Sequence, residues 1–510
     1  MLSSLSASIF LSLFLARHAR ASVAFCNDLD YESGALGLSP SQTYNAAPFS
    51  PVQINYALAP SDCPANSQVE GYFFYSPQGV VAMPGGGLIM NPNGTMVYFA
   101  AGFGQSSMRG LQEYEGADHL AIWVGDGSPV TGGHGSGYNL LLDNTYSVVA
   151  NVTVTNLGTG ADVHELQITP NKTAVMTAYP TQEADLTAFG GPNPGYLLNC
   201  AAQEVDITTG EAVFTWQALD HVDPSECFAA IGEAGTGTVD DPWDYFHINS
   251  IQKNDDGNYL ISSRHCHTLY LVNPDGDIIW RMGGMNSNFT FGPGANYTWQ
   301  HHARIHNSST LSVFNNGASE FDQDFPFSQG LLLNYDDSAM TVSLINARSP
   351  FDPGDSIVGW GAIPYYSQHD TDGNILWSVQ FGLVPDSAYR VFLHDWIARP
   401  TTPPSIQVSN TSSSGNVTVY AWWNGATEVT AWQLLGSTAD EPMVASPLIV
   451  ADKLDFETVL TYTGDDEYAY FQVAAMNADG KILGFSDFTS LNGTITFVKA
   501  DNQTVTAASL

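Results

Sequence analysis

Apolar and polar positions alternate along most of this chain in short runs that end at turns rich in Asp, Asn and Gly. Alternation with a period of two residues predicts strands, and the 3.6-residue periodicity of helices is scarce between them. The pattern therefore predicts an all-β protein. A hairpin of apolar strand, polar turn and apolar strand occurs six times, at residues 87–99, 138–152, 204–216, 269–280, 331–344 and 365–377.

The spacing of these hairpins indicates the architecture. Consecutive turns are roughly 50 to 65 residues apart for four intervals and closer for the last, which is near the length of a four-stranded propeller blade. Six hairpins predict a six-bladed β-propeller over residues 22–400, in which residues 22 to about 70 form an N-terminal extension that packs on the propeller or adds an outer strand. Three hairpins end in Trp216, Trp280 and Trp377, which we expect to be structural.

A second β-rich region follows the Pro-rich joint Arg-Pro-Thr-Thr-Pro-Pro at residues 399–404. The spacing of its strands suits a small sandwich, so we expect an immunoglobulin- or fibronectin-III-like β-sandwich over residues 401–490 and a C-terminal tail over 491–510. Strands are predicted near residues 416–424, 428–435, 446–451, 456–462, 468–475 and 480–486.

Three consecutive repeats open with a short strand that carries a histidine at the same place: His164, His247 and His301. The first strand of each propeller blade lines the central channel, so equivalent positions on neighbouring blades point toward one axis. We therefore predict that these three side chains meet in the channel. The alternative is a structural role, in which each imidazole bonds the backbone of a neighbouring blade.

The N-terminus predicts the compartment. An apolar run from Leu2 to Ala16 precedes Ala19-Arg20-Ala21, a small-x-small cleavage site, so residues 1–21 are predicted to be a signal peptide and the protein to be secreted, in the secretory pathway or outside the cell. The run is too short to span a bilayer, and we expect no membrane partner. N-glycans are expected on some of the Asn-x-Ser/Thr acceptors at Asn93, Asn151, Asn171, Asn288, Asn296, Asn307, Asn410, Asn416, Asn492 and Asn502.

The net charge of −37 excludes nucleic acid and anionic membranes as binding partners. It also makes the cationic cluster between residues 243 and 306 conspicuous, because an anionic ligand can be held only where Arg and His gather. Arg264 lies in this cluster beside the histidines. A neutral imidazole can act as a nucleophile, and Arg and protonated His can offset negative charge, so His164, His247, Arg264 and His301 are candidate catalytic residues for an anionic ligand.

Five cysteines leave at least one unpaired. The pairings nearest in sequence are Cys26 with Cys63 and Cys200 with Cys227, which would leave Cys266 free. In His265-Cys266-His267, alternation on a strand would place the two histidines on one face and the thiol on the other, so a buried thiol or a solvated face is favoured over a metal site. No metal and no cofactor are expected.

Four further residues are candidates for binding an aromatic substrate. Tyr245 and Trp299 could stack an aryl ring, although propellers also use such rings between blades. His134, among glycines, could line the channel mouth or belong to a flexible loop. His302 follows His301 directly and is expected to face away from it, with packing between blades as the alternative.

The chain resembles the arylsulfotransferase family, particularly its secreted fungal branch. The resemblance is carried by several blocks in order: Gly71-Tyr-Phe-Phe, the strand Asp162-Val-His-Glu-Leu-Gln-Ile-Thr, the residues from Asp244-Tyr-Phe-His-Ile to Gln300-His-His-Ala-Arg, Ser387-Ala-Tyr-Arg, and Trp423-Asn-Gly-Ala-Thr-Glu-Val. It implies a six-bladed propeller that transfers a sulfuryl group from an aryl sulfate to a phenol. It further implies His301 as the histidine that is transiently sulfated, with His164, His247 and Arg264 around the sulfate.

Two alternatives stay open. The family block commonly reads Gln-His-Asp-Ala-Arg, and this chain has His302 in place of the Asp, which removes a carboxylate that could orient the nucleophile. The same scaffold could therefore carry a cyclase or pericyclase, for example of the hetero-Diels–Alder type, in fungal aromatic polyketide or meroterpenoid biosynthesis. It could also be a propeller that binds its ligand without turnover.

Overall fold

The computed structural model describes residues 24–59, 63, 69–79, 86–128, 133–347, 356–370, 374–410, 416–439, 444–464 and 468–490. Within them almost all regular structure is β-strand, so the chain is all-β, as the sequence predicts. None of the described helices has the length and apolar character needed to cross a membrane. The predicted signal peptide, residues 1–21, and the predicted tail, 491–510, lie outside the described residues. The helices are α1 (Leu29–Glu32) and 3-10 turns at Ala101–Phe103, Thr187–Phe189, Ala218–Asp220 and Pro224–Glu226.

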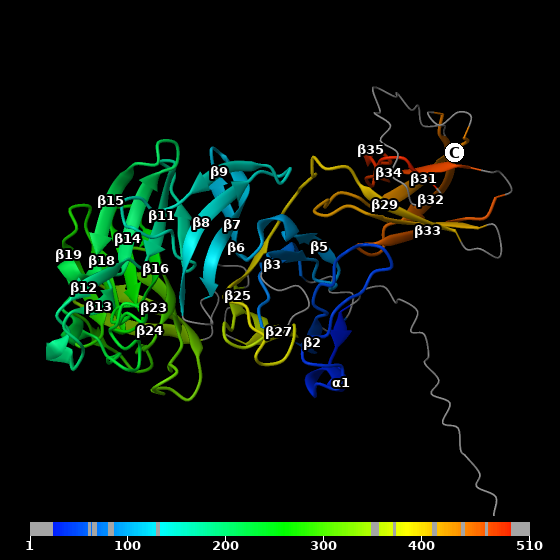
Figure 1. Cartoon of the computed structure of the whole chain (residues 1–510). Coiled ribbons are helices and arrows are strands. Elements are labelled where there is room, and N and C mark those ends of the chain that lie inside the picture. Colours follow the sequence, from blue (N-terminus) through cyan, green and yellow to red (C-terminus); the bar gives the residue numbers. More distant parts are fainter. Residues whose placement is uncertain are drawn as a thin grey trace, which may run out of the picture.

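Six sheets of four or five strands are formed by the part of the chain that comes before residue 395 (Figure 1). The first three are β28 (Val391–His394), β3 (Tyr72–Tyr75), β4 (Leu88–Met90), β5 (Met96–Phe99); β6 (Ser106–Tyr114), β7 (Ala117–Ser128), β8 (His134–Leu142), β9 (Val148–Val152); and β10 (Leu166–Ile168), β11 (Thr173–Ala178), β14 (Ala201–Asp206), β15 (Ala212–Gln217). The other three are β16 (Ile248–Lys253), β17 (Tyr259–Ser263), β18 (Thr268–Val272), β19 (Ile278–Gly283); β21 (His301–Asn307), β22 (Thr310–Asn315), β23 (Gln329–Asp336), β24 (Thr341–Ala347), β20 (Thr290–Phe291); and β25 (Ser356–Gly359), β26 (Tyr365–His369), β27 (Ile375–Gln380), β2 (Asn55–Leu58), β1 (Phe25–Cys26).

The edge strands of these sheets meet around a shared centre. Along the chain, β28 contacts β6, β6 contacts β10, β10 contacts β16, β16 contacts β21, and β25 contacts β28. Between the sheets of β21 and β25, the ring of Phe314 lies 6.1 Å from that of Trp360. The sheets are thus arranged as in a β-propeller, with one edge strand of each at the centre.

Each of the six hairpins expected from the sequence is an antiparallel pair. The three hairpin tryptophans are buried, and each contacts an aromatic ring of the next sheet or of the segment that leads into it. Trp216 lies beside Phe246, and Trp280 lies beside Tyr335. These aromatic contacts bury apolar surface between sheets and stabilise their order around the centre.

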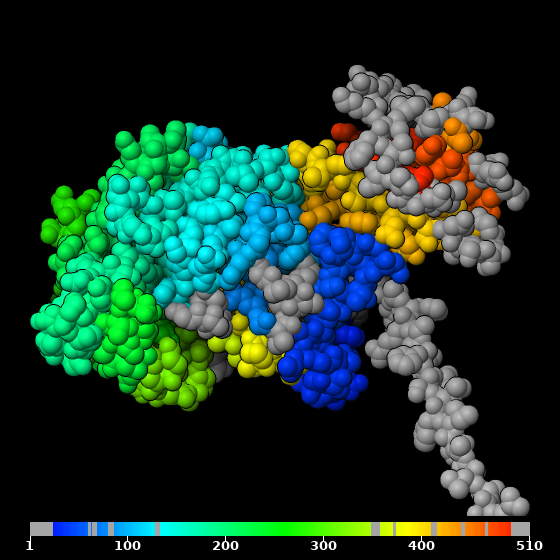
Figure 2. Space-filling model, in the orientation of Figure 1, coloured from blue at the N-terminus to red at the C-terminus, as the bar shows by residue number. Residues whose placement is uncertain are grey.

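Strands from the beginning and from the end of residues 24–394 pair with each other and so join the first sheets to the last. β28, late in the chain, pairs with β3, and β2 pairs with β27, so the N-terminal extension contributes outer strands. Four hydrogen bonds from Asn45, Ala46 and Ala47 end on the Glu457 carboxylate in the C-terminal region. Figure 2 shows the blue N-terminal residues against the yellow and orange C-terminal ones.

The C-terminal region has two sheets, and one hydrophobic cluster takes residues from both. Val419 and Ala421 of one sheet and Trp432 and Val473 of the other belong to this cluster. All six strands expected here are present. One sheet consists of β29 (Ser405–Asn410), β30 (Val417–Trp422) and β33 (Thr458–Tyr462). The other consists of β32 (Ser446–Asp452), β31 (Ala431–Ser437), β34 (Tyr470–Met476) and β35 (Ile482–Phe485), with β36 (Thr489–Ser490) paired to β34. Earlier in the chain, β12 (Thr181–Ala184) and β13 (Gly195–Leu198) form a separate two-stranded sheet.

One disulfide expected from the sequence is correct and the other is wrong. Cys26 pairs with Cys63, but Cys227 pairs with Cys266, and Cys200 is the free, buried thiol. The physical reason is a turn at residues 264–267, between β17 and β18, where a continuous strand was expected. Because the backbone N–H of the residue after Cys227 donates to a carbonyl in this turn, the two cysteines are held side by side.

Candidate functional site

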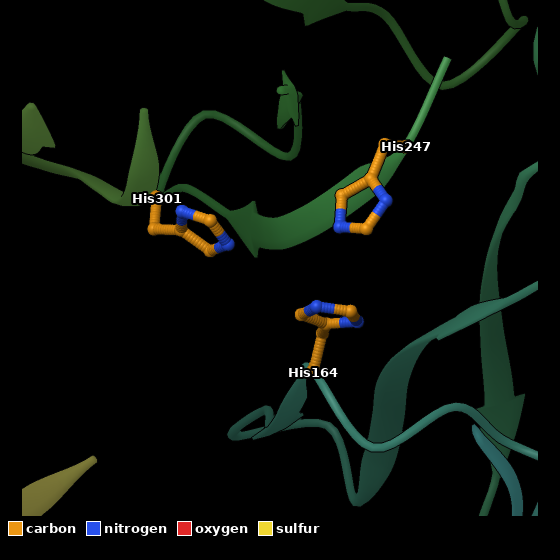
Figure 3. A group of neighbouring side chains, drawn as sticks. All are labelled: His164, His247 and His301. Atoms are coloured by element: carbon orange, nitrogen blue, oxygen red, sulfur yellow. The ribbon is translucent and has the colours of Figure 1, made fainter. Parts of the chain in front are cut away.

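Three histidines from three consecutive sheets lie close together where the central edge strands of these sheets meet (Figure 3). His164 precedes β10 by two residues, His247 comes directly before β16, and His301 is the first residue of β21. The centroid of the His164 ring is 5.2 Å from that of His247 and 6.1 Å from that of His301, and the His247 and His301 centroids are 6.3 Å apart. The fold therefore brings together the three positions that repeat analysis predicted to converge.

Each imidazole is anchored through its Nδ1 atom. His164 Nδ1 donates to Asp162 Oδ2 at 2.6 Å, and His247 Nδ1 donates to Asp244 Oδ2 at 2.5 Å, since a carboxylate can only accept. His301 Nδ1 donates to the amide Oδ1 of Asn316 at 2.7 Å.

With Nδ1 protonated in every ring, the lone pair of a neutral imidazole lies on Nε2. Among the described residues, the buried His164 Nε2 atom has no hydrogen-bond partner. The anchoring bonds thus leave Nε2 as the atom that a ligand at the centre would meet.

Arg264 is held beside this group. Its guanidinium donates to Glu320 Oε2 at 3.0 Å and to His265 Nε2 at 2.9 Å, and it lies over the Trp299 ring at 5.4 Å. Trp299 is only 2% exposed and donates its indole N–H to Asp324 at 2.8 Å. Trp299 therefore supports Arg264 rather than facing the cavity.

A cavity of about 1230 Å³ opens onto the site. His247, Arg264 and His301 line it, and so do the predicted substrate contacts His134 and His302. The His134 ring is stacked on that of Tyr179 with centroids 4.8 Å apart, which fixes its orientation at the wall. The volume is ample for an aromatic ring with substituents.

Tyr245 lies elsewhere. Its side chain is fully buried in a hydrophobic cluster with Trp243 and Phe246, and it does not line the cavity. Tyr245 and His247 lie in the same segment before β16, but Tyr245 packs into the core and His247 lines the cavity. We leave it out of the site for this reason.

Backbone conformation explains why alternation fails around His302. Both His301 and His302 line the cavity, although neighbouring strand residues point to opposite faces. The register of β21 shifts between His301 and Arg304, and His302 has a φ of 53°. His247 has a φ of 51°, so two cavity residues adopt the left-handed conformation that L-residues seldom use. Such conformations concentrate at functional sites.

Behind His164, a buried ion-pair cluster joins three sheets. The Glu165 carboxylate accepts from Arg304 at 2.6 Å and from two nitrogens of Arg390 at 3.0 and 3.1 Å. Arg109 is 2% exposed, and its guanidinium nitrogens have no hydrogen-bond partner among the described residues. Sequence reasoning did not single out this cluster, nor Tyr389, which also lines the cavity. The adjacency of Glu165 to His164 was the available signal.

The surroundings set the protonation of the histidines. Burial, followed by the charges of His164 and Arg264, lowers the pKa of His247 well below its usual range. Burial and Arg264 lower the pKa of His301 in the same way, against the hydrogen bond to Asn316. Although burial opposes it, the pairing with His164 lowers the pKa of Asp162 to about 2. The site thus holds neutral imidazoles at His247 and His301, each with an anchoring side chain behind it.

His265 and His267 have structural partners. His265 Nδ1 donates to the Asp244 carbonyl oxygen at 2.5 Å, and His267 is stacked on Phe228 with centroids 4.2 Å apart. Cys266 is in the disulfide. The predicted alternation of these residues on a strand is wrong because they form a turn.

Comparisons with known proteins identify one family. The family model described as "Arylsulfotransferase (ASST)" matches residues 110–382, more than half of the chain, and this span includes all the cavity histidines named above. No curated protein matches the chain significantly.

Three solved structures show a distant likeness. A protein of unknown function from Bacteroides caccae is 11% identical; the alignment covers 63% of this chain and 97% of that protein, with a TM-score of 0.37. A protein from Lactobacillus plantarum is 11% identical over 77% of this chain and 99% of its own, with a TM-score of 0.32. An inactive virginiamycin B lyase from Staphylococcus aureus is 10% identical over 72% of this chain and 92% of its own, with a TM-score of 0.25.

Proposed function

The chain belongs to the arylsulfotransferase family, and from this premise we propose its function. The enzyme moves a sulfuryl group from an aryl sulfate to a phenol through a sulfohistidine at His301. The observation that supports this most is the convergence of three imidazoles, each anchored at Nδ1, two of which line one cavity together with Arg264.

The anchors divide the roles. His301 is anchored by a neutral amide and has a lowered pKa, so its Nε2 lone pair is available as a nucleophile. His164 and His247 are anchored by carboxylates, which stabilise an imidazolium. An anion favours the protonated form of a nearby imidazole, so an entering sulfate ester favours rings that donate to its oxygens.

Transfer then proceeds in two displacements. In the first, His301 Nε2 attacks sulfur, the bond from sulfur to the aryl oxygen breaks, and that oxygen takes a proton from His164 or His247 as the phenol leaves. In the second, the acceptor hydroxyl oxygen attacks the same sulfur, the N–S bond breaks, and the acceptor proton returns to the histidine that gave one. Arg264 offsets charge on the sulfuryl oxygens in both steps, as fixed donors do in other transfer sites.

The proposal includes the setting of the site. The six central sheets are the blades of a six-bladed propeller over residues 22–400, and the two C-terminal sheets form a sandwich over 401–490. The enzyme is secreted after loss of residues 1–21 and carries N-glycans. The order of the edge strands around the centre and the two disulfides support this assignment.

The test is release of nitrophenolate from 4-nitrophenyl sulfate in the presence of a phenol. Wild-type protein should release it, His301→Ala should abolish release, and Arg264→Gln should lower kcat by about 100-fold, the effect of losing one fixed donor. His221→Ala is the matched control, because that ring is stacked on Trp216 and does not line the cavity. Intact-mass measurement of wild-type protein should reveal one added sulfuryl group. Undiminished release by His301→Ala protein would contradict the role of His301.

One observation favours a second candidate. His301 is anchored by an amide and has His302 as its neighbour, so no carboxylate polarises it directly. A cavity of about 1230 Å³ also accommodates more than a simple phenol. If no acceptor supports nitrophenolate release, we favour a cyclase or pericyclase that shapes a reactive aromatic substrate in this cavity.

A further inference from the structure

The three-histidine centre has the features of a metal-binding site. One ring nitrogen from each of His164, His247 and His301 lies within 4.8 Å of the others. Imidazoles on a tetrahedral Zn²⁺, with Zn–N distances of about 2.0 to 2.1 Å, have ring centroids about 5 Å apart. The centroid distance of 5.2 Å between His164 and His247 is close to that arrangement. The two longer distances, 6.1 and 6.3 Å, both involve His301, so the His301 ring would move toward the other two when an ion binds.

The hydrogen bonds behind the rings match those of histidine ligands. A metal-binding histidine almost always donates its other ring N–H to a carboxylate, a carbonyl or water, which fixes the tautomer and raises ligand basicity. Here every Nδ1 donates to a side-chain oxygen, of Asp162, Asp244 or Asn316. His164 Nε2, 0% exposed at the residue level, has no other partner among the described residues.

The charges nearby also suit a dication. Asp162 and Asp244 place two carboxylates directly behind two of the rings. The two arginines whose charges act on His301 are both paired, Arg264 with Glu320 and Arg390 with Glu165. A cation held by the three rings would lie next to the Asp162 and Asp244 carboxylates.

A second cluster of possible ligands, Asp244, His247 and His265, does not qualify. Its Asp244 and His247 atoms bond each other, and both nitrogens of His265 are engaged, one by the Asp244 carbonyl and one by Arg264. These atoms support the first cluster and have no lone pair directed at an ion.

We infer that His164, His247 and His301 bind one divalent first-row transition metal ion, such as Zn²⁺, through Nε2, with its fourth position open to the cavity. Nitrogen ligands of this kind suit Zn²⁺, Cu²⁺ and Ni²⁺. The inference goes beyond sulfuryl transfer and does not depend on it. Because the metal would use the Nε2 lone pair of His301, the metal-bound form cannot form a sulfohistidine.

Metal uptake can be measured directly on the full chain. Protein stripped with EDTA is titrated with ZnCl₂ by calorimetry, and bound zinc is counted by elemental analysis. We expect one Zn²⁺ per chain, loss of tight binding in His164→Ala, His247→Ala and His301→Ala, and roughly 10- to 100-fold weaker binding in Asp162→Asn, which removes an outer partner. His221→Ala should bind as wild type does.

Cobalt gives a readout that needs no variant. Co²⁺ added to stripped wild-type protein should show the intense visible bands of a tetrahedral site, and added Zn²⁺ should remove them. No uptake by wild-type protein, wild-type affinity in the three alanine variants, or a six-coordinate cobalt spectrum would each overturn the inference.

Turnover of nitrophenyl sulfate is assayed separately, on the stripped protein, so failure of sulfuryl transfer leaves the metal result intact. Where the stripped protein is active, saturating Zn²⁺ should inhibit it. Full activity with zinc bound would place the ion elsewhere and refute the inference.

Discussion

Substitution of Glu165 offers a direct test of how the central edge strands of the sheets are held together. Glu165 lies directly before β10, whereas its partners Arg304 and Arg390 lie on β21 and directly before β28. Glu165→Gln keeps the shape of the side chain and removes its charge. Two buried guanidiniums would then lose the anion that compensates them, and three sheets would lose a common contact.

The size of the effect follows from the pKa. Although burial opposes it, Arg304 and Arg390 lower the pKa of Glu165 from 4.5 to about 2. Because each unit corresponds to about 1.4 kcal/mol, the charged form contributes about 3 kcal/mol to folding at neutral pH. Loss of one partner of a buried pair costs about 3 to 5 kcal/mol, which agrees.

The assay is guanidinium unfolding of both proteins at pH 7 and at lower pH. Glu165→Gln should lower the free energy of unfolding by about 3 kcal/mol, and the difference should shrink as the pH falls from 4.5 toward 2. The sign follows because a carboxyl group whose pKa is lowered on folding stabilises the folded state fully at pH values above 4.5, and this stabilisation is lost as the pH falls toward 2. Glu115→Gln is the control, since its pair with Lys172 is exposed and worth at most about 1 kcal/mol. Equal losses in the two variants would refute the reasoning.

Two further predictions concern the contact between the N-terminal residues 45–47 and Glu457, and the proposed nucleophile His301. Glu457→Ala leaves the backbone N–H groups of Asn45, Ala46 and Ala47 without their acceptor. It should therefore lower the free energy of unfolding by about 3 kcal/mol and speed proteolysis of the N-terminal extension. A proteolysis rate equal to that of wild type would contradict this prediction. The lowered pKa of His301 should keep its imidazole neutral as the pH falls through 6.5, so the acid limb of kcat/KM should lie well below that pH, and a limb at 6.5 would show that His301 is not the group observed.

Local pattern was enough to predict the scaffold. Period-2 alternation and Asp/Asn/Gly turns depend on neighbouring residues only, so the six hairpins and the C-terminal strands lie where the sequence places them. The convergence of the histidines could be predicted for the same reason. His164, His247 and His301 have equivalent positions in repeated units, and the arrangement of the sheets around a shared centre brings them together.

The rest depended on contacts distant in sequence or on unusual backbone. Glu165 and Arg390 are 225 residues apart, and nothing local connects them. Cys266 pairs with Cys227 because of a turn that the alternating pattern concealed. His302 faces the cavity through a left-handed φ that no pattern of side chains would reveal.

The anchors behind the histidines link the two proposals for this site. Two rings have a carboxylate anchor and one has an amide, so the same three Nε2 atoms can present either three neutral ligands or one nucleophile with two charged donors. A cation favours the first state and an anionic sulfate ester the second, because a cation binds the neutral form of an imidazole and an anion attracts the protonated form. The chemistry of the centre is therefore set by Asp162, Asp244 and Asn316 as much as by the histidines. Since these anchors lie in loops and not in the hairpins, the site can change its ligand while the scaffold stays the same.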